Sequence, residues 1–83
     1  MNDSNFKQIL LEEIGKIAPE MEGVAVDPDA NLREAFDLDS MDFLNLVAAI
    51  HKRLGIDVPE AEYARLSSLN AAVTYLVKRA GTA

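Results

Sequence analysis

The 83-residue sequence contains no cysteine and no tryptophan, and its single histidine is His51. Without cysteine the chain forms neither a disulfide framework nor a thiolate metal site. No apolar run approaches the roughly 20 residues that are needed to cross a bilayer. The first five residues lack the basic and apolar segments of a signal peptide. These absences lead us to expect a cytoplasmic protein.

Basic residues are scarce, with 8 Lys and Arg against 14 Asp and Glu and a net charge of −6. The acidic residues cluster between Glu20 and Asp42, where Arg33 is the one base. Nucleic acids and anionic membranes are bound through Lys and Arg, so this balance argues against both as partners. It favours protein partners that carry basic patches, because opposite charge raises the rate of encounter.

Motifs for catalysis or metal binding are also missing. His51 follows Ser40 by eleven residues, which in one straight helix separates them by roughly 16 Å. That distance is too great for His51 to act as the base of a serine nucleophile. The alternating polar residues at 27–31 resemble the start of a calcium loop, but leucines occupy the later positions that require glycine and glutamate. We therefore predict neither an enzyme nor a metal site.

Helical periodicity is the main pattern that the sequence does contain. Apolar residues recur at three- and four-residue spacings in three segments, which predicts helices over 4–18, 40–54 and from Ser67 or Ser68 to Gly81. Gly55 is the expected left-handed C-cap of the second of these. The predicted core positions are Phe6, Ile9, Leu10, Ile14, Ile17, Phe43, Leu46, Val47, Ile50, Leu54, Leu69, Ala72, Val73, Leu76 and Ala80.

The remaining segments are shorter. A brief helix is expected from Pro59 to about Leu66, because proline favours the first turn of a helix. Residues 19–38 read as a long loop with a short helical turn around 30–36. We expect this loop to be held by its own apolar side chains, which are Val24, Val26, Leu32, Phe36 and Leu38. The predicted fold is all-α, a four-helix bundle of three longer helices and one short helix, with a long loop between helices 1 and 2 and a single domain over residues 1–83.

The segment from Asp37 to Leu44 reads as the end of this loop and the first turn of a helix. Asp39 is the expected N-cap, because its carboxylate can accept hydrogen bonds from free backbone N–H groups. Ser40 then occupies the first helical position, with its small side chain at the exposed tip. Acidic residues surround it at 37, 39 and 42. Such a hydroxyl is either an ordinary part of a helix start or an attachment point.

A second apolar group lies on the same predicted helix, apart from its core stripe. Met41, Leu44 and Ala48 follow the spacing i, i+3 and i+7, and Ser40 projects between the two arcs. One helix of a small bundle needs only one buried stripe. The second group is therefore either additional core or a docking face, and we favour the docking face.

The segment Leu38-Asp39-Ser40-Met41-Asp42, after a long acidic loop, closely resembles the prosthetic-group site of acyl carrier proteins, the phosphopantetheine-dependent carriers. The resemblance covers nearly the whole chain, including Gly55-Ile56-Asp57-Val58-Pro59 and the segment 66–76. It implies a phosphoprotein in which a phosphopantetheinyl transferase attaches 4′-phosphopantetheine covalently to Ser40, beside the flanking acid Asp39. It also implies a non-catalytic carrier that meets acyl-loading and acyl-processing enzymes through Asp37, Met41, Asp42, Leu44 and Ala48.

The resemblance leads us to expect a stand-alone, monomeric acyl carrier protein in lipid or fatty-acid biosynthesis, or in a dedicated secondary pathway. Met41 replaces the leucine that usually follows the serine. Asn45, His51 and Lys52 stand where carriers of fatty-acid synthesis usually place glutamates, which hints at a dedicated pathway. Two alternatives remain. One is a carrier-like acidic binding module that is never modified, and the other is a carrier of aminoacyl or polyketide units.

Overall fold

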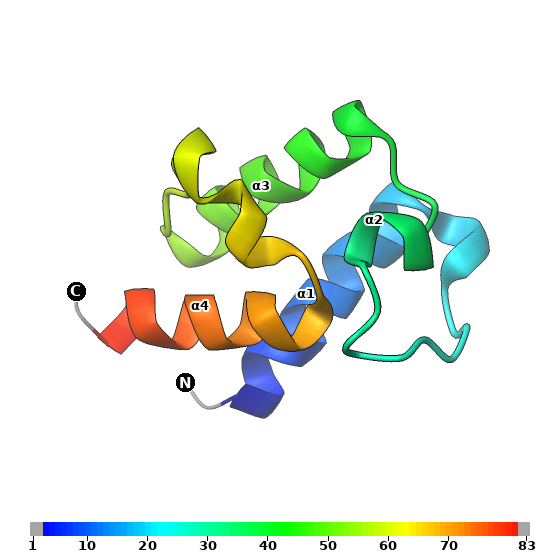
Figure 1. Ribbon diagram of the computed structural model, residues 1–83, viewed down its shortest axis with the longest axis horizontal. Helices are drawn as coiled ribbons and strands as arrows, with labels where there is room; N and C mark the ends of the chain where they lie inside the picture. The colour runs from blue at the N-terminus through cyan, green and yellow to red at the C-terminus, as the bar shows by residue number, and fades with distance from the viewer. Residues whose placement is uncertain (1–2, 82–83) are drawn as a thin grey trace.

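Four α-helices and two 3-10 helices make up the fold in the computed structural model, which describes residues 3–81 (Figure 1). The α-helices are α1 (Asp3–Ile17), α2 (Leu32–Ala35), α3 (Ser40–Leu54) and α4 (Leu69–Gly81), and the 3-10 helices are η1 (Pro19–Met21) and η2 (Glu60–Leu66). Extended pairing within the described range is limited to one isolated bridge, between Asn31 and Ser68. The all-α class is confirmed, as are the three longer helices.

The three longer helices enclose the core. Helix α1 packs against both α3 and α4, and η2 packs against α4. Leu46, Ile50 and Leu76 have no exposed surface and lie at the centre of a single cluster of buried side chains. Figure 1 shows α2 below the first turns of α3, on the same side of the molecule. The start of α3 therefore stands at one end of the bundle, beside the segment that leads into it.

Most of the predicted core positions are buried. Ile17, Val47 and Leu54 are only partly buried, and they pack against the edge of the core. Ala80 was predicted to be buried but is exposed, because the last turn of α4 extends beyond the helices that cover its inner face (Figure 1). Tyr75 is 6% exposed and joins the core, although the helical pattern did not predict it.

The segment between α1 and α3 is more ordered than a plain loop. Pro19 follows the end of α1, as predicted, and also begins η1. Leu32, Phe36 and Leu38 are buried and Val26 is partly buried, but the prediction for Val24 is wrong, since its side chain is 49% exposed. Hydrogen bonds to the segment at the start of α4 also hold this loop.

These hydrogen bonds join residues 28–32 to the start of α4. The Leu32 N–H donates to the Ser67 carbonyl at 2.7 Å, and the Asn70 N–H donates to the Pro28 carbonyl at 3.0 Å. The Ser68 hydroxyl also caps α4, because it accepts from the Ala71 N–H at 3.0 Å. Buried backbone groups require partners, so this pairing holds α2 at a set place on the bundle.

Two further predictions concern the segment after α3. Gly55 ends α3 in the left-handed conformation, with φ 70°, and its N–H donates to the His51 carbonyl at 2.8 Å. The brief helix expected between Pro59 and Leu66 is present as η2, in 3-10 rather than α-helical geometry. Glycine therefore acts as the predicted C-cap, whereas Pro59 precedes the helix as its N-cap and does not lie in its first turn.

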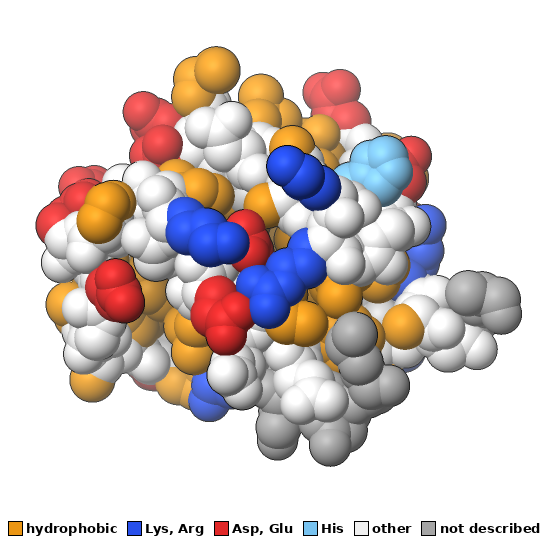
Figure 2. Space-filling model, turned by 180° about the vertical axis from the view of Figure 1, so that it is seen from behind, with side chains coloured by type: hydrophobic (Ala, Val, Ile, Leu, Met, Phe, Trp, Pro, Cys, Tyr) orange, Lys and Arg blue, Asp and Glu red, His pale blue; other side chains and the backbone are white. Residues whose placement is uncertain are grey.

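A charged network joins α1 to α3. Glu13 is the one buried charged side chain in the described part of the chain, at 8% exposure. Arg53 donates to Glu13 at 2.8 Å and pairs with Glu12 at 2.7 Å, and Lys16 pairs with Glu13 at 3.1 Å. Hydrogen bonds from Arg53 hold the pKa values of both carboxyl groups below their ordinary range. Figure 2 shows acidic and basic side chains in contact across the middle of the rear face.

Candidate functional site

Helix α3 begins at Ser40 with a reciprocal cap. The Asp39 carboxylate accepts from the Asp42 N–H at 2.8 Å, and the Asp42 carboxylate accepts from the Asp39 N–H at 3.3 Å. Asp39 is therefore the N-cap that the sequence predicted, and Asp42 completes a capping box. The cap sets the position at which the helix begins, and so places Ser40 in its first turn.

Ser40 lies exposed at the first position of α3. The backbone N–H groups of Ser40 and Met41 have no acceptor within the helix, as is general for the first turn. The positive end of the helix dipole lies at the same place. An anion attached to the Ser40 hydroxyl would therefore meet a favourable electrostatic environment from the backbone alone.

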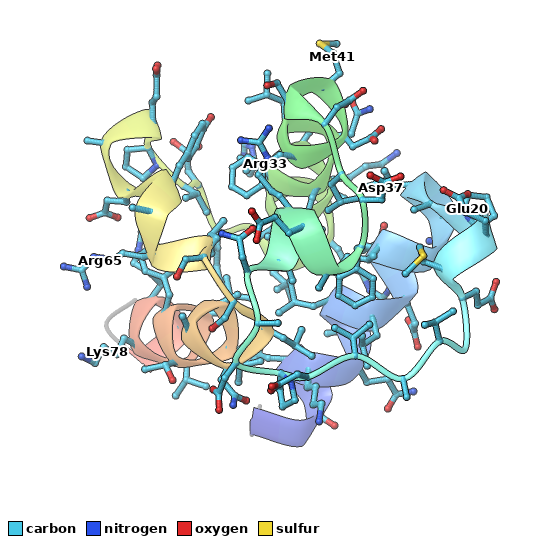
Figure 3. All side chains as sticks on the ribbon, turned by 45° about the vertical axis from the view of Figure 1, so that its right-hand side comes forward. Glu20, Arg33, Asp37, Met41, Arg65 and Lys78 are labelled. Atoms are coloured by element: carbon cyan, nitrogen blue, oxygen red, sulfur yellow. The ribbon has the colours of Figure 1, made fainter. Side chains whose placement is uncertain are left out.

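The chain reaches α3 through a Schellman motif at the end of α2. The Leu38 N–H donates to the Arg33 carbonyl at 2.7 Å, and the Asp37 N–H donates to the Glu34 carbonyl at 3.3 Å. Asp37 lies in the left-handed region, with φ 54°, where glycine is usual at this position. The turn buries Leu38 and leaves Asp37 exposed beside the start of α3 (Figure 3).

Arg33 is a site residue that the sequence analysis did not identify. Its Nη2 donates to the Ser40 Oγ at 3.3 Å, and its guanidinium carbon lies 5.8 Å from the centre of the Phe43 ring. Figure 3 shows Arg33 extending from α2 toward α3. The available signal was its position as the one base among the acidic residues from 20 to 42. That signal does not reveal a contact with Ser40.

The second apolar group of α3 is exposed, so it is not additional core. Met41 is 65% exposed and Leu44 is 44% exposed, and Ala48 also lies on the surface. Figure 3 shows Met41 pointing away from the body of the protein at the tip of α3. These residues stand on one side of Ser40. The Phe43 ring on the other side is buried and packs edge-to-face against Tyr63 of η2, with ring centres 5.4 Å apart.

His51 is not brought to this site. His51 is in the last turn of α3, with Lys52 and Arg53, at the opposite end of the helix from Ser40. Over residues 3–81 there is no group of three or more His, Cys, Asp or Glu side chains suited to hold a metal ion. No helix in this range has the length and apolar character required to span a membrane.

Comparison with known proteins identifies the family. Residues 7–76 match the family described as the phosphopantetheine attachment site. An acyl carrier protein of Campylobacter hominis is 33% identical over 70 residues, which cover 81% of this chain and 89% of the relative. An acyl carrier protein of Rubrobacter xylanophilus is 28% identical over 75 residues, which cover 87% of this chain and 93% of the relative. The chain therefore belongs to the acyl carrier protein family, whose members are non-catalytic carriers with a covalently attached 4′-phosphopantetheine group.

Proposed function

We propose that this protein holds acyl intermediates as thioesters on a 4′-phosphopantetheine arm attached to Ser40, and presents them to partner enzymes. The observation that carries the proposal is the exposed Ser40 hydroxyl at the first position of α3, directly after the capping acid Asp39. The pathway is either fatty-acid-like lipid biosynthesis or a dedicated secondary pathway. The arm would supply the terminal thiol that this cysteine-free chain lacks.

Attachment requires little of the chain itself. A bond forms between the Ser40 Oγ and the phosphorus of the pantetheine phosphate in coenzyme A, and the bond from that phosphorus to adenosine 3′,5′-bisphosphate breaks. The hydroxyl proton passes to a base of the transferase, since His51 lies at the other end of α3. What Ser40 must provide is access, and its exposure on a convex helix tip supports that role.

The surroundings of Ser40 suit the phosphodiester that results. The first backbone N–H groups of α3 and the Arg33 side chain are donors next to the Ser40 Oγ. No buried apolar surface has to be opened to place an anion there, because Asp39, Ser40 and Met41 are all exposed. The donors and the exposure therefore fit the group that the family carries.

We further propose that the transferase and the acyl-loading and acyl-processing enzymes contact Asp37, Met41, Asp42, Leu44 and Ala48. The apolar members of this set provide contact area, and the acidic members favour partners with basic patches. Asn45, His51 and Lys52 leave the rest of α3 without the acidic residues usual in carriers of fatty-acid synthesis. This departure favours a dedicated set of enzymes. We also propose that the protein is a cytoplasmic monomer with one carrier domain over residues 1–83.

The attachment site is tested by intact mass spectrometry after incubation of the apo-protein with coenzyme A and a phosphopantetheinyl transferase. We expect the wild-type protein to gain the mass of one arm and Ser40→Ala to gain none. Ser67→Ala is the matched control, because Ser67 is also exposed and stands beside a helix start. It should be modified at the wild-type rate. Circular dichroism of Ser40→Ala checks that its helices are intact.

Failure of several transferases of broad specificity to modify the wild-type protein would contradict the proposal. That result would favour the unmodified acidic binding module instead. The mass of protein isolated from its native host distinguishes the remaining alternatives, because it reports the acyl, aminoacyl or polyketide cargo directly. The same measurement tests whether the carrier stands alone.

A further inference from the structure

The Arg33 guanidinium makes two contacts with the first turn of α3. One is the hydrogen bond from Nη2 to the Ser40 Oγ at 3.3 Å, and the other is the approach to the Phe43 ring at 5.8 Å. The first contact is long for a hydrogen bond and joins a cation to a neutral hydroxyl. The guanidinium has five N–H donors, so its capacity for binding an anion is largely unused by Ser40.

Among the side chains that the structure describes, no carboxylate forms an ion pair with Arg33. The ion pairs found over the described residues involve Lys16, Arg53 and Arg79, and none involves Arg33. The nearby acids Asp39 and Asp42 are instead occupied with backbone N–H groups at the helix start. Arg33 therefore lies beside Ser40 as a positive charge that an anion on the serine oxygen could pair with.

The backbone of Arg33 is also well positioned for this role. Its carbonyl accepts the Leu38 N–H of the Schellman motif, and both Leu32, the first residue of α2, and Phe36, its C-cap, are buried. The position of Arg33 relative to α3 is thus set by core packing, so that only the side chain needs to be ordered when it binds. Preorganisation of this kind lowers the entropic cost of an ion pair.

We infer that Arg33 binds the phosphodiester formed on Ser40 and acts as the positioning residue for the root of the arm. The inference rests on the proposed function. Esterification of the Ser40 Oγ brings non-bridging phosphate oxygens within reach of the same guanidinium that now contacts the hydroxyl. Hydrogen bonds between a guanidinium and a phosphate are charge-assisted and stronger than the contact that they replace.

Binding of the phosphate by Arg33 would also set the direction in which the arm leaves Ser40. At about 100° per residue, Ser40 projects between Phe43 on one side and Leu44 on the other. Arg33 lies over the Phe43 side. An arm whose phosphate is held by Arg33 therefore starts away from Met41 and Leu44, and leaves these exposed apolar side chains free for a partner enzyme.

The first test compares melting temperatures of the apo and modified forms at low salt. The change in melting temperature on modification should be about 2–4 °C more favourable in the wild-type protein than in Arg33→Ala. Arg33→Lys should retain part of the difference. Arg65→Ala is the matched control, because Arg65 is an exposed arginine of η2 that points away from α3 (Figure 3). It should behave like the wild type.

The second test needs no variant. The Nε–Hε resonance of Arg33 in a two-dimensional NMR spectrum should shift on modification by more than that of Arg65. Intact mass spectrometry of every sample reports whether the arm is present, so a failure of the proposed function appears as no added mass. Full modification with equal melting shifts in wild type and Arg33→Ala, or with no excess shift of the Arg33 resonance, would overturn the role of Arg33 alone.

Discussion

Met41 and Leu44 are the two large apolar side chains of α3 that the core leaves exposed, at 65% and 44%. Both stand within one helical turn of Ser40, and Asp37 and Asp42 lie beside the same helix tip. Exposed apolar side chains that are grouped beside charges often mark a protein-binding surface. At the scale of single residues, these side chains contribute little to the folded state, so they can be changed without loss of stability.

Leu44→Ala is therefore expected to reduce partner recognition without destabilising the protein. The kcat/KM of the phosphopantetheinyl transferase for the apo-protein should fall by about tenfold, as for a moderate interface residue. Leu11→Ala is the matched control, because Leu11 is 40% exposed on α1 and borders a hollow lined also by Met21 and Val24. Steady-state assays with both variants make the comparison. Equal losses for Leu44→Ala and Leu11→Ala would argue against a docking role for Leu44.

At the scale of elements, the site depends on how α2 ends and α3 begins. The four residues of α2 are too few to form a stable helix alone. They are held by the Asn31 cap, by buried Leu32, and by the Schellman motif that places Asp37 in the left-handed region. Asparagine and aspartate tolerate this conformation better than other residues with a side chain, and glycine adopts it without steric cost.

The free energies of unfolding of Asp37 variants should follow the order in which residues tolerate the left-handed conformation. Asp37→Gly is expected to raise the free energy of unfolding by about 0.5 kcal/mol, and Asp37→Ala to lower it by a similar amount. Asp57→Gly is the control, since Asp57 is an exposed aspartate without a positive φ, and it should lower stability. Urea unfolding measures all three. A stabilising effect of Asp37→Ala would be inconsistent with the strain assigned to this position.

At the scale of the whole molecule, the network of Glu12, Glu13 and Arg53 joins α1 to α3 and makes stability depend on pH. Arg53 lowers the pKa of both carboxyl groups in the folded protein. A carboxyl group whose folded pKa lies below its unfolded pKa stabilises the protein above the unfolded value, which is about 4.3 for glutamate. That contribution is lost as the pH falls through the folded pKa.

Glu13→Gln should accordingly cost about 1 kcal/mol of unfolding free energy at pH 7, with a smaller cost at lower pH. The difference from wild type should shrink as the pH falls below the unfolded glutamate pKa of about 4.3 and through the lowered folded pKa of Glu13, because the carboxylate is protonated first in the unfolded and then in the folded protein. Glu20→Gln removes the same charge from an exposed side chain of η1 and controls for net charge. Urea titrations at several pH values test this. A difference that does not decrease once the pH is below the unfolded glutamate pKa would exclude the proposed linkage.

The sequence by itself determined the features that depend on near neighbours in the chain. The spacing of apolar residues predicted α1, α3 and α4, because a helix brings residues three and four apart onto one face. Asp39 and Gly55 marked the two ends of α3, because their caps involve only backbone groups within one turn. For the same reason, the exposed position of Ser40 at the helix start and its separation from His51 could be predicted from their places in one helical segment of the sequence.

Only the tertiary structure decided the features that join distant residues. Glu13 and Arg53 are forty residues apart, and nothing local marks either as part of a partly buried ion pair. The backbone bonds between residues 28–32 and the start of α4 join segments almost forty residues apart, and near neighbours in the chain do not encode them. Arg33 reaches Ser40 because a left-handed Asp37 turns the chain back between α2 and α3. Such contacts arise from packing, and packing is a property of the assembled helices.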